Sequence, residues 1–302
     1  MNEWSRYWRK GHVTSFAQYF SHGYGKAIQG WLDDVDNQIQ QLNHHTVLEL
    51  CSGNCSLLPF VIDAVKAFDY TGIDSADISL PEVVRRRLTA SRNTATVVNN
   101  VPVESLPNII QNVTLALSIY GIEYSRIEET VSGLLPRMRP QGKLFGLIHH
   151  SESEVKQGAL RMLDQYNQID LDIINDSLNT LNRTSDCPEA KNKFNSICDK
   201  YMHGITSQTR NRFMVERVLR SLSFFEMTDN SFEDKASFID ELEQEAFAER
   251  LCNEQMINSA KTKSEMYDLA DYMRSIGWAN VFFKEQTYQG AILGWSLTAT
   301  VN

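Results

Sequence analysis

The sequence predicts an α/β protein built on a mostly parallel sheet with helices on both faces. Residues 46–150 alternate short apolar runs with amphipathic stretches, as strands and helices do along a parallel sheet. The first apolar run, 47–50, breaks into a loop of small residues, and a second, 68–73, ends in Asp74. From about residue 151 to 260 the pattern changes to successive helices, with no linker rich in Pro, Gly or Ser before them. We therefore expect one α/β core with a helical insertion packed onto it.

Composition and charge restrict the class of protein. The 302 residues are 42% hydrophobic, enough for one large core or a core with a smaller appendage. We find no run of about eighteen apolar residues and no cationic start before an apolar stretch, so we expect no membrane span, no signal peptide and a cytoplasmic location. The five cysteines form no close pair of the zinc-binding kind, so we expect reduced thiols and no metal.

The negative charge is concentrated in the helical segment. Residues 151–275 hold 15 Lys and Arg against 23 Asp and Glu, which is −8 of the total −9. Such a surface repels a nucleic-acid backbone, so we expect no nucleic-acid partner. The sequence leaves a homodimer open.

The loop after the first strand carries candidate ligand contacts. Cys51 and Gly53 are small enough for a ligand to approach the backbone, and a helix that opens directly after the loop aims its free N–H groups at the same place. Glu49 lies inside the strand, where it would mainly fix the loop. Asp74 follows Glu49 by 74 − 49 = 25 residues, at the tip of the second strand. A carboxylate there is placed to accept hydrogen bonds from both hydroxyls of a ribose.

Segments 47–55, 70–74, 115–121 and 142–148 resemble, in order and spacing, the motifs of class I S-adenosylmethionine-dependent methyltransferases. The resemblance implies a seven-stranded, mostly parallel sheet that ends in an antiparallel hairpin. It also implies S-adenosylmethionine as the cofactor. The family's loop usually has three glycines on alternate positions, whereas this chain has cysteines in place of the first and third. The cofactor contacts that the resemblance implies at the first, second and fourth strands are Glu49, Cys51, Gly53, Asp74 and Ser118.

The same resemblance suggests how the chain divides. Residues 1–45 form an N-terminal helical aromatic arm, and residues 46–150 form the cofactor-binding core. Residues 151–263 form a helical cap inserted after the fifth strand. Residues 264–302 supply a last helix and the C-terminal hairpin that completes the core, with strands at 278–287 and 291–301.

The aromatic arm has apolar residues at helical spacing, so most of its rings should pack on the core. Related methyltransferases often fold such an arm over the cofactor, and the face of an aromatic ring attracts a sulfonium cation. Tyr19 and Tyr24 are the candidates for that contact. Core positions are expected for Phe16, Phe20, Ile28 and Trp31.

Polar and aromatic residues follow the third and fourth strands. In the family the end of the third strand commonly bonds the adenine, so Asn99 or Asn100 is a candidate, with an Asn pair that only forms a turn as the equal alternative. The fourth strand ends in Ser118 and is followed by Tyr120, which we expect over the ligand crevice at the carboxyl end of the sheet. An ordinary half-buried loop tyrosine is the alternative for Tyr120.

The fifth strand ends in His149 and His150. Histidine is the side chain most easily poised as a general base near neutral pH, and this strand end faces the methyl donor in the family. Because successive side chains of a strand point to opposite faces, one of the two histidines should face away. Catalysis by His149 or His150 is therefore the hypothesis, and a histidine that only pairs with a carbonyl is the alternative.

The function expected from these features is methyl transfer from S-adenosylmethionine to an oxygen or nitrogen of a small molecule. A large cap suits an enclosed small molecule better than a macromolecule. A catalytically silent S-adenosylmethionine-binding protein is one alternative, favoured by Cys51 and Cys55 in place of glycines. A nicotinamide-dependent oxidoreductase is the other, but it requires Gly-x-Gly-x-x-Gly after the first strand, which this sequence lacks.

Overall fold

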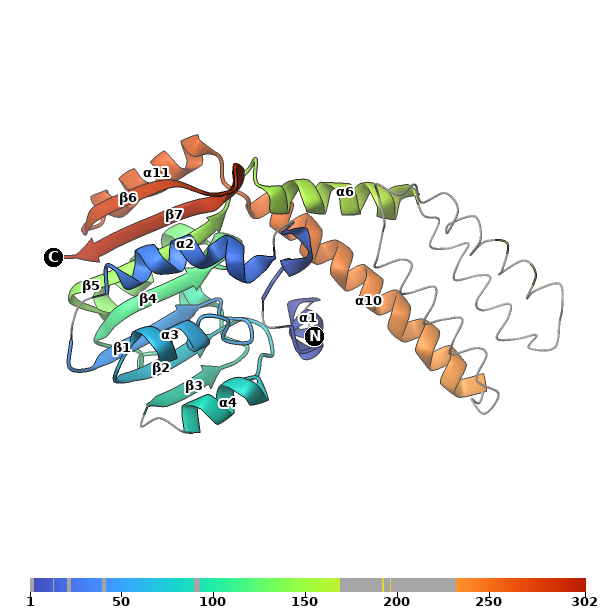
Figure 1. Ribbon diagram of the computed structural model, residues 1–302, viewed down its shortest axis with the longest axis horizontal. Coiled ribbons are helices and arrows are strands. Elements are labelled where there is room, and N and C mark those ends of the chain that lie inside the picture. The colour runs from blue at the N-terminus through green and yellow to red at the C-terminus, as the bar shows by residue number, and fades with distance from the viewer. Residues whose placement is uncertain are drawn as a thin grey trace. The chain divides into compact units, whose positions relative to one another are not determined.

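The computed structural model describes residues 3–12, 14–20, 23–39, 42–89, 93–168, 192, 196 and 232–302. The chain forms two compact units, one of Met1–Ala159 with Glu254–Asn302 and one of Leu160–Asn253. The first unit contains the whole of the described sheet (Figure 1). The helical segment expected at 151–263 begins with α6 (Glu154–Gln168) and ends with α10 (Phe232–Ser259). The successive helices expected between these two lie outside the described residues.

Seven strands of the described chain form one sheet in the order β3-β2-β1-β4-β5-β7-β6. Strands β1 to β5 pair in parallel, and β7 pairs antiparallel with both β5 and β6. The predicted fold, a mostly parallel seven-stranded sheet with a C-terminal antiparallel hairpin, is therefore confirmed. The strands are β1 (His45–Leu50), β2 (Phe68–Ile73), β3 (Thr94–Val98), β4 (Val113–Ile119), β5 (Met138–His149), β6 (Trp278–Tyr288) and β7 (Ala291–Val301).

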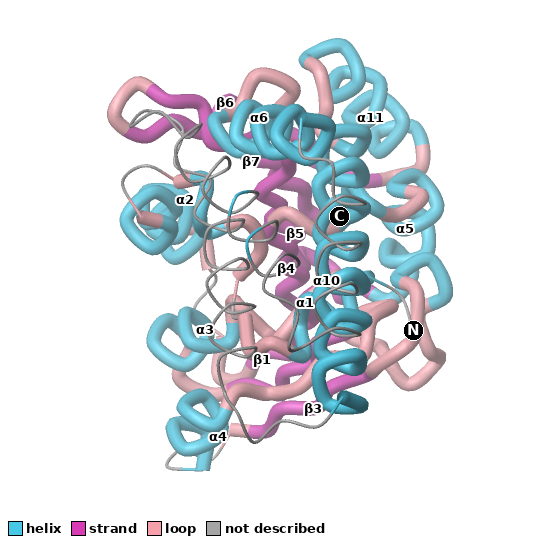
Figure 2. Tube along the Cα trace, turned by 90° about the vertical axis from the view of Figure 1, so that its right-hand side faces the viewer, coloured by secondary structure: helices cyan, strands magenta, loops and turns pink. Residues whose placement is uncertain are grey.

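Helices cover both faces of the sheet, which explains the continuous apolar runs of its central strands. Figure 2 shows α2 (Tyr24–Asp36), α3 (Leu58–Ala64) and α4 (Glu82–Thr89) on one side, with α5 (Ile127–Leu134) and α11 (Lys263–Ser275) on the other. Every residue of β4 is buried as a result. None of the described helices is long and apolar enough to cross a membrane.

The C-terminal hairpin closes through a two-residue turn. Gln289 and Gly290 have φ angles of 49° and 83°, and a type I′ turn requires positive φ at both central residues. Strand β7 is interior to the sheet and buries the consecutive residues from Leu293 to Leu297, whereas Phe282 on the edge strand β6 is 60% exposed.

The aromatic arm folds as α1 (Glu3–Arg9), the 3-10 turn η1 (Ala17–Tyr19) and α2. Its expected core positions are confirmed, with exposed fractions from 1% to 6%. These residues are Phe16, Phe20, Ile28 and Trp31.

Side chains cap the starts of two helices. At the start of α6, Ser153 Oγ accepts from the N–H of Lys156 at 3.2 Å. The start of α11 carries a capping box that the sequence reading missed. Thr262 Oγ1 accepts from the N–H of Glu265, and the Glu265 carboxylate accepts from the N–H of Thr262.

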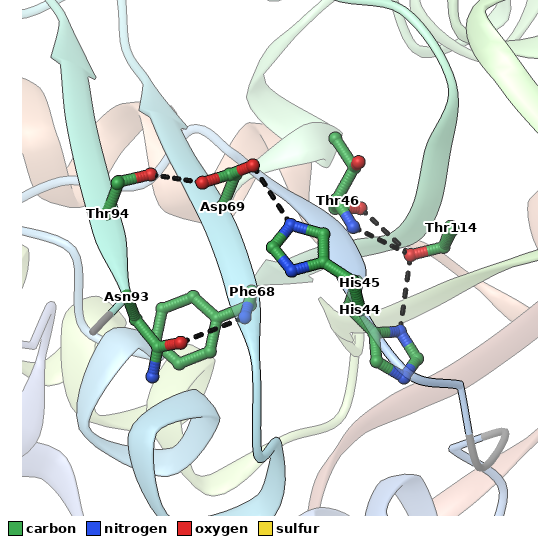
Figure 3. A network of polar contacts seen from close by, with 8 residues as sticks. All are labelled: His44, His45, Thr46, Phe68, Asp69, Asn93, Thr94 and Thr114. Atoms are coloured by element: carbon green, nitrogen blue, oxygen red, sulfur yellow. Dashed lines mark hydrogen bonds and ion pairs between the residues drawn. The ribbon is translucent and has the colours of Figure 1, made fainter. Parts of the chain in front are cut away.

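Polar side chains fix strand register where β1, β2 and β4 begin, at the edge opposite the loops discussed below (Figure 3). Thr114 Oγ1 accepts from the N–H of Thr46 at 3.0 Å, donates to the Thr46 carbonyl at 3.1 Å and lies 3.2 Å from His45 Nδ1. Asp69 accepts from Thr94 Oγ1 and lies 2.9 Å from His44 Nε2. A one-residue slip of a strand would break these bonds as well as reverse its buried face.

We expect Thr114→Val to lower the free energy of unfolding by about 1 to 2 kcal/mol, because the shape is kept while buried polar groups of β1 lose their partner. Urea denaturation measures the change. Thr298→Val is the matched control, since Thr298 Oγ1 lies 3.5 Å from the carbonyl of Phe282 in an exposed position. Equal losses in the two variants would contradict a register-fixing role for Thr114.

Candidate active site

Glu49 holds the loop after β1 from inside the sheet. The side chain is 1% exposed, and both carboxylate oxygens accept from the N–H of Leu57 at 3.3 Å. The hydroxyls of Ser56, at 3.2 Å, and Tyr70 also donate to Glu49. Burial raises the pKa of Glu49 to about 7, against the lowering effect of these hydrogen bonds. Glu49 therefore holds the loop and the start of α3 in place.

The loop keeps a backbone that favours glycine at all three alternate positions. Cys51, Gly53 and Cys55 have φ angles of 50°, 49° and 59°, in the left-handed region that side chains with a Cβ rarely adopt. Glycines on neighbouring segments make room for the two cysteine side chains. A Cβ on Gly121 would lie 2.6 Å from the Cβ of Cys51, and one on Gly72 would lie 2.8 Å from the Sγ of Cys55.

Asp74 joins the ends of β1 and β2. Its Oδ2 accepts from the N–H of Gly53 and its Oδ1 from the N–H of Ala76, both at 2.8 Å. The residue is 7% exposed, and burial raises the pKa of its carboxyl. The structure thus brings together the expected ribose carboxylate and the central glycine of the loop.

Ser118 and the asparagine pair complete the strand ends. Ser118 is fully buried, and its Oγ donates to the carbonyl of Leu50 at 3.0 Å and accepts from the N–H of Ile122 at 3.1 Å, so it ties β4 to β1. Asn99 is partly buried and accepts from the N–H of Ile78 at 3.3 Å. Asn100 is exposed, has a φ of 57° and acts as the turn residue of the pair.

Trp8, on α1, is the arm residue that reaches the loop. A Cβ on Gly53 would come within 2.5 Å of the Trp8 ring, so the indole lies directly on this glycine. Trp8 also packs with the buried residues Ala76 and Ile78 and the partly buried Val97. The sequence reading did not single out Trp8, because nothing in its spacing separates it from the other aromatic residues of the arm.

The tyrosines proposed to cover the cofactor make other contacts. A Cβ on Gly158 would lie 2.7 Å from the Tyr19 ring, which also stacks on Phe16 with the ring centres 5.8 Å apart. The Tyr24 ring meets Phe20 edge to face, with the ring centres 5.1 Å apart.

Tyr120 and His149 stack on one another where β4 and β5 end. Their ring centres are 4.4 Å apart and their planes differ by 15°. The Tyr120 hydroxyl donates to the carbonyl of Leu293 at 3.3 Å, so its ring face, and not its oxygen, is turned to the histidine. Phe16 and Tyr124 meet the His149 ring edge to face, with centres 5.9 and 5.8 Å away.

His150 has a separate environment. Its ring centre lies 4.2 Å from that of Trp295, and its Nδ1 accepts from the N–H of Glu152 at 2.8 Å. Its Nε2 lies 4.0 Å from Glu285 Oε1. Of the two histidines, the structure brings only His149 together with Tyr120.

Glu123 is a buried acid that the sequence reading passed over. It is 3% exposed in the 3-10 turn η3 (Ile122–Tyr124), and its Oε1 accepts from the backbone N–H of His149 at 2.7 Å. Burial raises the pKa of Glu123 to about 7 and lowers the pKa of His149 to about 3. Histidine 149 is therefore neutral at pH 7, and Glu123 can both hold and release a proton there. The signal in the sequence that could have identified Glu123 is its place as an acid in the loop after the fourth strand.

Glu123 and His149 carry polar atoms that nothing in the described chain satisfies. Oε2 of Glu123 and both ring nitrogens of His149 are buried without a hydrogen-bond partner among the described residues. Leaving such an atom without a partner costs about 1 to 3 kcal/mol, so each one calls for an explanation. A bound ligand with a hydroxyl or amine would satisfy them. No cluster of three or more His, Cys, Asp or Glu suited to a metal ion occurs in the described ranges.

No protein-family model matches the chain, and no curated protein sequence matches it. Solved structures of methyltransferases are similar to it. The plantazolicin methyltransferase BpumL in complex with SAH shares 10% identity over 99% of this chain and 98% of that one, with a TM-score of 0.43. PigF with SAH shares 13% identity over 92% of this chain and 56% of that chain, with a TM-score of 0.39.

A methyltransferase in complex with the Haloferax volcanii activator Trm112 shares 15% identity over 50% of this chain and 62% of that chain, with a TM-score of 0.37. At these identities and TM-scores the similarities carry no argument about the site or the activity. The fold assignment rests on the strand order and on the antiparallel placement of β7.

Glu123→Gln should change how stability depends on pH. The folded-state pKa of about 7 lies above the ordinary value of 4.5, so the folded protein binds the proton more tightly than the unfolded chain. The contribution of Glu123 to stability is therefore fully present below the ordinary value and is lost as pH rises through about 7. The free energy of unfolding of the variant, relative to the parent, should rise by about 1 to 3 kcal/mol across this window and then level off.

Urea denaturation of both proteins from pH 4 to 8 measures this difference. Taking the difference removes the opposite contribution of His149, which both proteins share. A difference that stays constant with pH would show that Glu123 has an ordinary pKa.

Proposed function

We propose that this protein is an S-adenosylmethionine-dependent methyltransferase that acts on an oxygen or nitrogen of a small molecule. The observation that carries the proposal is the contact between Asp74 and Gly53, at 2.8 Å. It places a buried carboxylate and a glycine with left-handed φ together, at the ends of adjacent parallel strands. The carboxylate suits the hydroxyls of a ribose, and the glycine allows a nucleoside to approach the backbone.

The residue types at these strand ends suit the parts of S-adenosylmethionine. Asp74 would accept hydrogen bonds from the ribose hydroxyls, Gly53 would let the ligand approach the backbone, and Asn99 would bond the adenine. Glu49 and Ser118 would hold the strand ends in place. The cofactor, when bound, supplies a methyl group already activated by its sulfonium.

The ends of β4 and β5 are the proposed place of the acceptor. Methyl transfer is an in-line displacement, so the chain has to align the acceptor, exclude water and take up a proton from it. Neutral His149 would accept a hydrogen bond from the acceptor's hydroxyl or amine, with Tyr120 supporting the imidazole ring. Glu123, whose pKa lies near 7, is better matched than His149 to remove the proton at neutral pH.

The charge of the chain supports a small acceptor. Residues 151–275 carry −8 of the net −9, which disfavours nucleic acid. The division into arm, core, cap and C-terminal hairpin stays part of this proposal, with α6 and α10 inside the cap at 151–263. A catalytically silent S-adenosylmethionine-binding protein with the same fold is the second candidate, because Cys51 and Cys55 stand at two left-handed positions of the loop where the family usually has glycine.

Calorimetric titration with S-adenosylmethionine tests the cofactor. We expect saturable binding that Asp74→Asn weakens at least tenfold, on the order of 1.4 kcal/mol, because the charged acceptor for the ribose is lost. Asp69→Asn, at the other end of the same strand, is the matched control and should bind as the parent does. Binding of NADH with none of S-adenosylmethionine would instead favour the oxidoreductase.

Paired histidine variants test the acceptor site. His149→Ala should lower kcat by about 10-fold to 100-fold, since it removes a group that orients the acceptor, whereas His150→Ala should keep near-parental turnover because His150 packs on Trp295. Turnover at saturating acceptor from pH 6 to 9 measures both. Full turnover of His149→Ala at every pH would exclude a catalytic role for His149, and cofactor binding without turnover on any acceptor would favour the silent protein.

A further inference from the structure

Helix α1 is fastened to both loops that carry the proposed cofactor site. In the loop after β1, Asn54 Nδ2 donates to the carbonyls of Trp8, at 2.8 Å, and His12, at 2.7 Å. In the loop after β2, the N–H of Asp77 donates to Ser5 Oγ at 2.9 Å. These bonds hold the helix across the ends of the two strands.

The Trp8 indole lies on the backbone of Gly53, which a nucleoside would have to reach. A single added carbon on Gly53 would come within 2.5 Å of the indole, so no ligand atom fits between them. Trp8 is 8% exposed, and the side chains that it covers, Ala76 and Ile78, are 0% and 4% exposed. They lie two and four residues after Asp74 in the chain, close to the group assigned to the ribose.

The Asp74 carboxylate is closed off in the same arrangement. Its two oxygens accept from the N–H groups of Gly53 and Ala76, and the residue is 7% exposed. The hydroxyls of a ribose would need access to these oxygens. The residue types therefore suit a nucleoside, but with α1 in this position the nucleoside has no room.

We infer that α1 is an autoinhibitory element whose Trp8 keeps the nucleoside part of the cofactor site closed. The ligand binds after α1 has moved off Gly53. The inference rests on the proposed function and adds a conformational step to it.

The size of α1 is suited to such a step. The helix has seven residues, and helices shorter than about 12 residues are marginal in water unless packing holds them. Removing its contacts with the two loops therefore releases it as a unit. The apparent affinity for the ligand is then proportional to the fraction of molecules in which α1 is released. A change that favours release therefore strengthens binding.

Titration calorimetry with S-adenosylhomocysteine as the probe tests this with four proteins: the parent, Trp8→Ala, Trp8→Phe and Phe282→Ala. Trp8→Ala removes the indole and should bind the probe about tenfold more tightly than the parent. Trp8→Phe keeps a smaller ring on Gly53 and should fall between them. Phe282→Ala removes an exposed aromatic ring on β6 and should leave the affinity unchanged.

Hydrogen exchange on the parent protein gives a second readout that needs no variant to fold. Backbone amides of residues 3–12 should exchange faster when the probe is saturating, because α1 has left its place. Slower exchange there would make α1 a cover that closes over the ligand and would overturn the inference.

The outcomes separate this inference from the proposed function. Weaker or unchanged binding by Trp8→Ala, with the parent binding well, overturns autoinhibition and leaves the cofactor assignment standing. Absence of binding in all four proteins contradicts the cofactor assignment and removes the basis of the inference with it.

Discussion

The buried Asp74 carboxylate is the constraint on which the rest of the site depends. It accepts from the N–H of Gly53 in one loop and from that of Ala76 in the next, so the ends of β1 and β2 are held at one point. Unpaired, a carboxylate this buried would be costly, and burial already raises its pKa. The conformation of the loop and the access of a ribose to Asp74 both depend on this contact.

Two more buried acids stand at the same edge of the sheet with different partners. Glu49 is surrounded by donors from β2 and from the two residues that precede α3, so its place is structural. Glu123 has one oxygen bonded to the N–H of His149 and one without a described partner. Burial raises the pKa of each acid to about 7, but Glu49 is held by its donors whereas Glu123 keeps an oxygen without a described partner, which suits the proton acceptor that we propose.

The sheet was predictable from the sequence because its signals are local. The apolar run that contains Glu49 and breaks into a loop of small residues, and the apolar run that ends at Asp74, mark parallel strands. Gln289 and Gly290 mark the turn of the hairpin that places β7 beside β5. The candidate site residues at these strand ends were predictable from the same signals. Strand alternation also required the side chains of His149 and His150 to differ in direction.

The aromatic contacts were not predictable in the same way. Trp8 lies 45 residues from Gly53 along the chain (53 − 8 = 45), and its contact depends on Asn54 and Asp77 holding α1. Tyr19 and Tyr24 have the helical spacing of a packed face, and they contact Gly158 and Phe20. Glu123 was missed because burial, and not residue type, makes that acid unusual.

A crystal structure of the protein grown with S-adenosylhomocysteine would show whether Asp74 holds the ribose. We predict ribose hydroxyls within hydrogen-bond distance of the Asp74 carboxylate and Trp8 withdrawn from Gly53. A nucleoside bound away from Asp74, or an Asp74 site that stays covered by Trp8 at saturating ligand, would contradict this prediction.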